Sequence, residues 1–275
     1  ARANGRAPAP APLDVPGEVA PWFYTVCLLG LRVVQAPLAA LPFTLLLLAS
    51  AHLLDLDGPK LVRWLCEAGP ASQPVWWWAT IGFAVAAVPA TLLAKALFLR
   101  CSPKVPLGTH ARWSWQHLQL QVRSELVDAA GLWLSGTLFW PAWLRLAGMR
   151  IGRDCEVSTI LDVLPEHAEL GGGSFLADGI YLGVPHQHQG RVTVAASGFG
   201  ERTFVGNHVV LPAGERLADD VVLGVSTVAA AARMPAGTGW FGQPAMQLHR
   251  REVVVVDRRL THAPGPLRYA NRVFW

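Results

Sequence analysis

The chain has 275 residues, of which 52% are hydrophobic and 15% are charged, and its formal net charge is +4. Soluble globular proteins carry about 25% charged residues, so this composition excludes an ordinary soluble domain and indicates contact with lipid. The small basic excess does not indicate nucleic acid as a partner, and the four cysteines, which lack C-x-x-C spacing, are expected to be free thiols.

Residues 1–18 are rich in proline and alanine without periodicity, which predicts a semi-rigid linker. Residues 19–112 contain two long apolar runs, each long enough to cross a hydrocarbon layer about 30 Å thick. We therefore predict a transmembrane helical hairpin with spans at about 22–54 and 75–99. Ten of the twelve tryptophans precede residue 144, as in the aromatic belts at membrane surfaces. The first run is too long for one straight span, so a break or an interfacial start is expected near Pro37 or Pro42.

Basic residues set the orientation expected for this hairpin. More of them follow the second run than lie in the loop between the runs, and cytoplasmic segments carry the excess of Lys and Arg. The chain after the hairpin is therefore expected on the cytoplasmic side of the membrane. The residues compared are Lys95, Arg100, Lys104 and Arg112 after the second run, and Lys60 and Arg63 in the loop.

Residues 113–148 are expected to form amphipathic helices. Trp115, Leu118, Val122 and Leu126 recur at helical spacing and predict one apolar face, with Arg123 on the other. Two arrangements are open for these helices. They lie along the membrane surface, or one of them closes the open end of the domain that follows.

Residues 149–249 carry an apolar residue every six positions, a period that belongs neither to a helix nor to a strand. A small residue or proline follows it each time. This pattern predicts a hexapeptide β-helix, in which three short strands close a triangular coil around the apolar residues. The predicted fold class is therefore mainly β, a single-stranded parallel β-helix preceded by the transmembrane hairpin and the interfacial helices. Residues 250–275 are expected to lead to a following element. The apolar positions are Leu164, Leu170, Leu176, Leu182, Phe199, Val205, Leu211, Leu217 and Leu223.

The repeat is interrupted once, between Leu182 and Phe199, so residues 184–191 are expected to leave the coil as a loop. This loop carries His186 and His188, and a histidine that titrates near neutrality suits a general base. One coil takes about 18 residues, so His208 is expected beside the root of the loop. A solvated surface role is the alternative for each histidine, and a zinc site built from all three is a further one.

Residues 205–214, 223–228 and 242–245 resemble the last coils of hexapeptide-repeat acyltransferases, whose coil is left-handed. The chain is more closely similar to the membrane-embedded C-terminal modules of poly-lysine-synthetase-type nonribosomal peptide synthetases. The stretches that carry this resemblance are 144–159, 175–183, 224–228 and 271–275. The resemblance covers nearly the whole chain and is weakest before residue 110.

The resemblance implies an acyltransferase that forms an amide bond between an amine and a carrier-bound aminoacyl thioester. The donor would be a phosphopantetheine thioester on a carrier domain, in cis or in trans. Other hexapeptide prisms are expected as partners, in a trimer of chains or a tandem pseudo-trimer. His188 is the first candidate for the base, ahead of His208 and His186, and Gly224 and Ser226 are expected to hold the pantetheine arm. A stand-alone membrane-associated acyltransferase that uses acyl-CoA and a non-catalytic scaffold are the alternatives.

Overall fold

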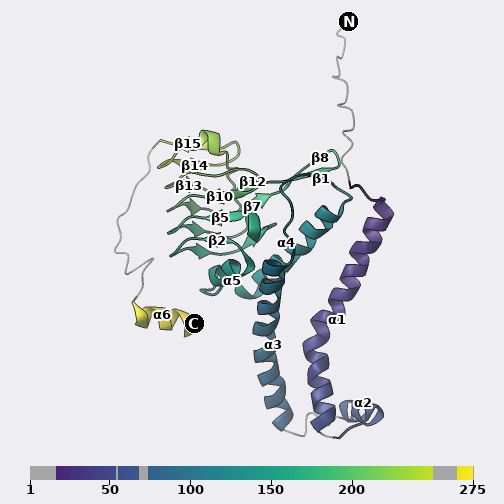
Figure 1. Ribbon diagram of the computed structural model, residues 1–275. Coiled ribbons are helices and arrows are strands. Elements are labelled where there is room, and N and C mark those ends of the chain that lie inside the picture. Colours follow the sequence, from purple (N-terminus) through teal and green to yellow (C-terminus); the bar gives the residue numbers. More distant parts are fainter. Residues whose placement is uncertain (1–16, 54, 68–73, 250–264, 275) are drawn as a thin grey trace.

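The structure, a computed structural model, describes residues 17–53, 55–67, 74–249 and 265–274. A stack of short strands forms one part of the molecule, and two long helices extend away from it (Figure 1). Residues 1–16 of the expected linker and residues 250–264 of the expected C-terminal segment lie outside the described residues. The helices are α1 (Pro21–Leu53), α2 (Gly58–Cys66), α3 (Pro74–Cys101), α4 (Trp115–Leu134), α5 (Trp140–Ala147) and α6 (Pro266–Phe274).

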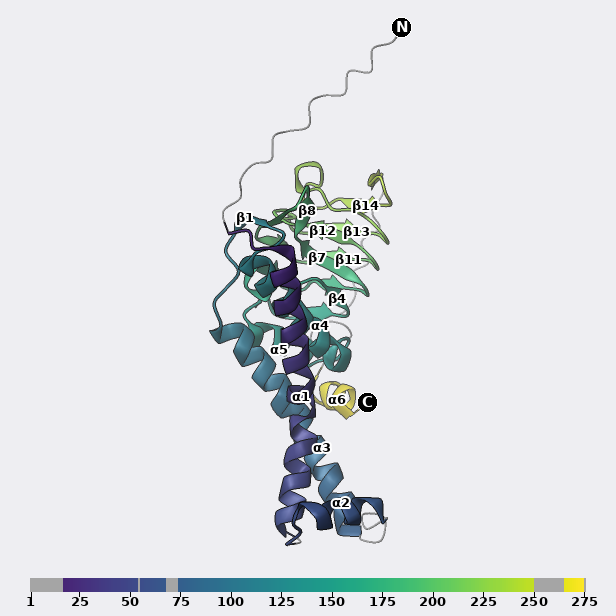
Figure 2. The same cartoon turned by 90° about the vertical axis from the view of Figure 1, so that its right-hand side faces the viewer.

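Helices α1 and α3 form the long pair, with α2 at the far end (Figures 1 and 2). The backbone of α1 is helical throughout, so the break expected near Pro37 or Pro42 does not occur. Over the residues that the structure describes, no helix combines the length and the hydrophobicity needed to cross a membrane. The predicted transmembrane hairpin is therefore without support.

Helix α4 begins at a local sequence signal and buries a face that the sequence does not indicate. Ser114 is its N-cap, and the Ser114 hydroxyl accepts a hydrogen bond from the N–H of His117 at 3.3 Å. The expected apolar face is exposed at Trp115, whereas the buried residues are His117, Leu120, Arg123, Ser124, Val127 and Ala130. Arg123 can be buried because the Glu166 carboxylate compensates its charge. Glu166 belongs to another element, so the periodicity of α4 could not indicate that Arg123 is buried.

The strands stack into a parallel coil with three sides. The first side is β2 (Arg150–Ile151), β5 (Ala168–Leu170) and β10 (Ser197–Phe199). The second is β3 (Glu156–Val157), β6 (Phe175–Leu176), β11 (Phe204–Val205), β13 (Val222–Leu223) and β14 (Gly239–Phe241), to which β15 (Met246–Leu248) adds antiparallel. The third is β4 (Ile160–Leu161), β7 (Ile180–Val184) and β12 (Val210–Pro212). Short 3₁₀ turns lie at Pro165–His167 and Ala231–Arg233.

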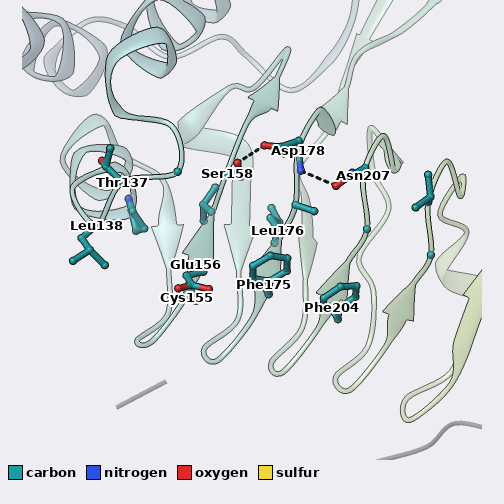
Figure 3. A pocket seen from close by; sticks show the side chains of 17 residues that line it. Thr137, Leu138, Cys155, Glu156, Ser158, Phe175, Leu176, Asp178, Phe204 and Asn207 are labelled. Atoms are coloured by element: carbon teal, nitrogen blue, oxygen red, sulfur yellow. Dashed lines mark hydrogen bonds between the residues drawn. The ribbon is translucent and has the colours of Figure 1, made fainter. Parts of the chain in front are cut away.

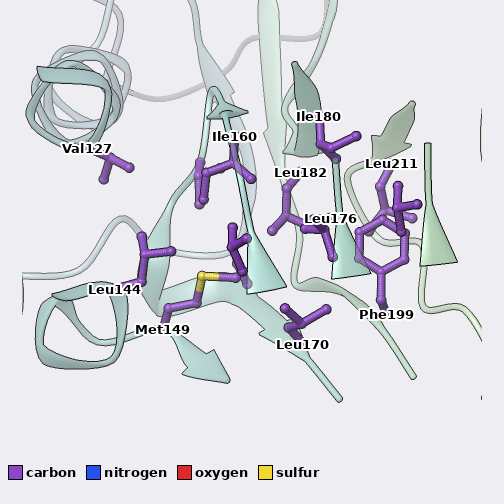
Figure 4. Close-up of a cluster of buried hydrophobic side chains, with 14 of the residues drawn as sticks. Val127, Leu144, Met149, Ile160, Leu170, Leu176, Ile180, Leu182, Phe199 and Leu211 are labelled. Carbon is purple, nitrogen blue, oxygen red and sulfur yellow. The ribbon is translucent and has the colours of Figure 1, made fainter. Parts of the chain in front are cut away.

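Residues six apart in the sequence fill the inside of this coil (Figure 4). Val205 pairs in parallel with Leu176 on one side and with Leu223 on the other, so equivalent positions of successive coils stack directly. All nine predicted apolar positions are buried, at no more than 5% exposure. The hexapeptide β-helix predicted from the period of six is therefore confirmed as a parallel coil.

Helix α5 closes the first coil. Trp140, Leu144 and Met149 are buried in the same cluster as Val157 and Ile160, which face the inside of the coil. The helix begins beside Pro141 and ends at Gly148, whose φ of 112° lies in the left-handed region that glycine tolerates. This is the capping arrangement, the second of the two expected for residues 113–148.

The interruption of the repeat forms an ordered hairpin. Strands β8 (His186–His188) and β9 (Arg191–Val194) pair antiparallel around a turn at Gln189 and Gly190, both with positive φ. Strand β1 (Gly108–Ala111), which precedes α4, pairs with β9 and completes a three-stranded sheet. The insertion therefore leaves the coil as expected, and it joins the coil to the helices.

Candidate functional site

A groove of about 620 Å³ runs along the second side of the coil (Figure 3). Its floor comes from successive coils, and the segment between α4 and α5 closes the end near the first coil. The lining residues are Gly136, Thr137, Leu138, Pro141, Cys155, Glu156, Val157, Ser158, Phe175, Leu176, Ala177, Asp178, Phe204, Gly206, Asn207, Gly224 and Val225.

The hexapeptide repeat itself gives the groove its open space and its apolar lining. Small residues occupy one corner position in every coil, at Ser158, Ala177, Gly206 and Gly224. The rings of Phe175 and Phe204 stack beside them with centroids 5.2 Å apart and planes 10° apart. Large side chains at the corners would fill the groove, so their absence leaves room for an extended, uncharged ligand.

A polar cluster lies at one edge of the groove, where the second side turns into the third. Ser158 and Thr159 donate hydroxyl hydrogen bonds to the carboxylate of Asp178, the latter at 3.3 Å. The Asp178 N–H donates to the side-chain oxygen of Asn207 at 3.2 Å. The Ser158 hydrogen bond is the main cause that lowers the pKa of the Asp178 carboxyl, and His208 acts in the same direction. Asp178 is therefore a carboxylate at neutral pH.

His208 stands next to this carboxylate. Its backbone N–H donates to the carbonyl oxygen of Asp178 at 2.9 Å. Its imidazole covers Gly179, where an ideal Cβ would lie only 2.6 Å from Nδ1. Gly179 and His208 both have positive φ, 69° and 56°, and histidine is among the residues that adopt this conformation more often than most. The turn therefore places the imidazole over Gly179, the residue that follows Asp178.

The two other histidines predicted as catalytic lie elsewhere. His186 and His188 are exposed on β8, with ring centroids 6.1 Å apart. Their hairpin leaves the coil where the third side turns into the first, whereas His208 occupies the corner before the third side. The expectation that His208 lies beside the loop root is wrong, because the insertion lengthens its coil and the residue one coil before His208 is Gly179, not Gly190.

The expected contacts of Gly224 and Ser226 hold only in part. Gly224 lines the groove, but its N–H donates to the carbonyl of Trp240 at 2.7 Å and is not free for a ligand. The N–H of Ser226 donates to the carbonyl of Asn207 at 2.9 Å, and the Ser226 side chain is exposed. Ser226 occupies the turn position that His208 occupies in the preceding coil. Gly224 contributes the space left by its missing side chain rather than a hydrogen bond.

Sequence reasoning missed Asp178, Asn207 and Glu156. Aligning the hexads would have shown the first two, because each occupies the second corner position after the buried residue, after Leu176-Ala177 and Val205-Gly206. The same alignment marks Glu156, which precedes the buried Val157 as Phe175 and Phe204 precede Leu176 and Val205 in the following coils. Among the described residues, no group of three or more His, Cys, Asp or Glu side chains is arranged to hold a metal ion.

No family model matches the chain. The delta-poly-L-ornithine synthetase of Acinetobacter baumannii (strain AB307-0294) is 32% identical over 177 residues, which are 62% of this chain. The chain spans only 13% of the length of that relative.

Similar solved structures include a maltose O-acetyltransferase from Clostridium difficile 630, with 11% identity, coverage of 53% of this chain and 94% of that one, and a TM-score of 0.38. A galactoside acetyltransferase in complex with coenzyme A has 13% identity, coverage of 55% and 88%, and a TM-score of 0.39. Soybean serine acetyltransferase has 14% identity, coverage of 62% and 74%, and a TM-score of 0.32. These scores are low, and the fold assignment rests on the strand pairing and the buried hexads of the chain itself.

Proposed function

We propose that this domain transfers an aminoacyl group from a thioester to an amine and so forms an amide bond. The observation that carries the proposal is an apolar groove whose edge holds the Asp178 carboxylate, with His208 at the same corner just outside the groove lining. The similarity to a protein named as a poly-ornithine synthetase supports an amide product, because linking ornithines through the delta amine requires amide bonds.

The groove favours a donor that is long and uncharged. Of the described residues that line it, none is Lys, Arg or His, and the Phe175–Phe204 stack supplies apolar contact. The phosphates of coenzyme A would require cationic partners, whereas a pantetheine arm presents amides and methylenes to the groove. We therefore prefer a carrier-bound pantetheine thioester as donor over acyl-CoA.

The carboxylates of the groove favour a cationic acceptor. Glu156 and Asp178 both line it, so an ammonium group is attracted toward the thioester site. An alkyl ammonium ion has a pKa of about 10.4 and must lose a proton before it attacks. That first proton leaves to solvent. The nitrogen loses a second proton during the attack, which His208 accepts while Asp178 favours the resulting imidazolium.

The reaction balances without another reactant. The amine nitrogen attacks the thioester carbonyl carbon, the C–N bond forms and the C–S bond breaks. The proton taken from nitrogen passes through His208 to the departing thiolate, which leaves as a thiol. The Ser158 and Thr159 hydroxyls hold the Asp178 carboxylate in place throughout.

Amide formation from an aminoacyl-pantetheine thioester and a primary diamine, followed by mass spectrometry, tests this proposal. His208→Ala is expected to lower kcat by about 10² to 10⁴, whereas His249→Ala, which removes an exposed histidine outside the groove, is the matched control. If His188→Ala abolishes turnover and His208→Ala does not, the base is His188 and the proposed geometry is wrong. Equal turnover of acyl-CoA would make the domain a stand-alone acyltransferase, and no turnover by the wild-type chain would make it a scaffold.

We further propose that the chain works at a membrane, with its coil on the cytoplasmic side and against other hexapeptide coils. The apolar character of residues 19–99 and the basic residues that follow them support this location. Protease digestion of inverted membrane vesicles is expected to cleave the coil, and sedimentation in detergent is expected to give an assembly larger than one chain. Release of the protein by carbonate washing would contradict the membrane location.

A further inference from the structure

At the corner between the second and third sides of the coil, backbone N–H groups are satisfied by side chains of the following coil. Thr159, Asp178 and Asn207 each come two positions after a buried residue of the second side, and the pairing of those strands stacks them in successive coils. The N–H of Thr159 donates to the Asp178 carboxylate. The N–H of Asp178 donates to the side-chain oxygen of Asn207 at 3.2 Å (Figure 3). We call this stack the corner ladder.

The corner ladder lacks an acceptor at its next step. Val205 pairs with Leu223, so the residue that follows Asn207 in the ladder is Val225. A valine side chain cannot accept a hydrogen bond, and in the described part of the chain nothing accepts the N–H of Asn207. The side-chain oxygen of Asn207 is already engaged by the N–H of Asp178, which leaves the NH₂ group of the same amide without an acceptor among the described residues.

Asn207 therefore brings two available donors to the groove. Asn207 and Val225 both line it, and both are exposed, Val225 at 47%. His208, the proposed base, is the next residue in the chain. Exposed N–H groups exchange water for a ligand oxygen at little cost, so a substrate oxygen in the groove can take these donors.

The neighbouring backbone donors are either engaged or less well placed. The N–H of Val225 also has no described acceptor, but Val225 lies one coil further from Asp178, and the Phe241 ring covers the adjoining Gly224. Asn207 thus offers the available donors nearest to the Asp178 and His208 corner. Three other corner N–H groups that line the groove donate to main-chain carbonyls of the following coil at 2.9, 2.8 and 2.7 Å, those of Ala177, Gly206 and Gly224.

We propose that Asn207 holds the oxyanion of the tetrahedral intermediate, an inference that rests on the proposed function. When the amine attacks, the C–N bond forms and the π electrons of the thioester carbonyl move to its oxygen. The Asn207 N–H and NH₂ groups donate to this negative oxygen. When the C–S bond breaks, the C=O bond forms again and the thiolate takes the proton from His208. The donors bind the negative oxygen more strongly than the neutral carbonyl, so they raise kcat and not only affinity.

Val225→Asn tests the backbone donor, because it completes the corner ladder. The new side-chain oxygen can accept the Asn207 N–H as Asn207 itself accepts that of Asp178. Val225→Leu is the matched control, since leucine has nearly the shape of asparagine and no acceptor. With an aminoacyl thioester on free pantetheine, kcat of Val225→Asn is expected to be at least about tenfold below that of Val225→Leu, with the two KM values within about twofold.

Asn207→Asp tests the side-chain donor. The new carboxylate still accepts the N–H of Asp178 but cannot donate, so kcat is expected to fall by about 10² to 10³. The fall should persist at the pH where this variant is most active, because a new charge near His208 would move the optimum without removing a donor. Gln187→Glu makes the same change in charge at an exposed position outside the groove and is the control.

A measurement without turnover separates this inference from the proposed function. A pantetheine-linked phosphonamidate carries a negative oxygen where the oxyanion forms, whereas the ketone analogue of the donor, with a methylene in place of sulfur, carries a neutral one. Calorimetry is expected to show at least about tenfold weaker binding of the phosphonamidate to Val225→Asn and Asn207→Asp than to their controls. Binding of the ketone should stay within about twofold. Circular dichroism shows that each variant is folded.

The outcomes divide between the two proposals. A loss in only one of the two variants supports the inference and assigns the oxyanion to that donor. If the wild type makes amide and both variants keep the kcat and the phosphonamidate affinity of their controls, Asn207 is not the oxyanion donor and the proposed function stands. If the wild type binds the phosphonamidate through Asn207 and makes no amide, the proposed function is refuted and the donor assignment stands. A wild-type chain that does neither overturns both.

Discussion

A buried ion pair joins the helices to the coil. Arg123 of α4 and Glu166 of the 3₁₀ turn are 1% and 3% exposed, with Nε and Oε1 2.7 Å apart. Arg123 also donates to the carbonyl of Leu99 at 2.7 Å and to the hydroxyl of Ser102 at 2.6 Å, both at the end of α3. The N–H of Val105 donates to Glu166 at 3.4 Å. Three segments distant in sequence therefore meet at one charged contact.

Removing one partner leaves the other charge buried without compensation. Arg123→Met is expected to lower the free energy of unfolding by about 3–5 kcal/mol, and Glu166→Met by a similar amount. The double variant Arg123→Met/Glu166→Met removes both charges and is expected to cost much less than the sum. The coupling energy of the double-mutant cycle should therefore exceed about 2 kcal/mol.

Urea unfolding followed by tryptophan fluorescence measures these differences. Arg202 and Asp220 form a matched exposed pair, since Arg202 donates to the carboxylate at 2.9 and 2.8 Å while the two side chains are 55% and 40% exposed. Arg202→Met should cost less than about 1 kcal/mol, because solvent screens the pair. The burial argument would be refuted if the losses in unfolding free energy of Arg123→Met and Glu166→Met added up in the double variant. It would also be refuted if Arg123→Met cost no more unfolding free energy than Arg202→Met.

Three further predictions concern the site, the core and one carboxyl group. Gly179→Ala is expected to lower kcat for amide formation at least tenfold while the coil stays folded, because the added Cβ would displace the His208 ring. Leu211→Ala, at a position with 0% exposure inside the coil, should lower the free energy of unfolding by about 2–5 kcal/mol. Burial, and then Asp162, raises the pKa of Asp128 from 3.8 to about 6, so this carboxyl stabilises the fold below pH 4 and loses that contribution as the pH rises to about 6. Asp128→Asn should remove this fall and raise stability at pH 7 by about 1 kcal/mol, since the group is only half-buried.

Each of these has a control and a contrary result. Gly237→Ala also replaces a glycine at positive φ, but nothing lies within 4 Å of its added Cβ, so a loss of activity equal to that of Gly179→Ala would remove the steric explanation. Leu248→Ala, at 48% exposure, should cost far less than the core substitution, and equal costs would contradict the inside position of Leu211. Unfolding of Asp128→Asn at pH 4 and pH 7 should differ less than that of the wild type. An unchanged pH dependence would mean that the carboxyl titrates normally.

The sequence alone determined the coil. The pattern repeats locally: every sixth residue is buried, and a small residue follows it. It can therefore be recognised in the sequence without any knowledge of distant contacts. Leu176, Val205 and Leu223 therefore stack as the spacing predicts. The same repeat showed where the chain leaves the coil, after Leu182.

Only the tertiary structure decided where the chemistry lies. The hairpin with His186 and His188 pairs with β1, more than 70 residues earlier. The insertion lengthens the coil, so that His208 lies against Gly179 and not beside the hairpin. The buried face of α4 was likewise set by Glu166, which neutralises Arg123 from another element. Periodicity describes which side of its own element a residue occupies. Which elements meet depends on long-range pairing and charge compensation, and these appear only when the chain is folded.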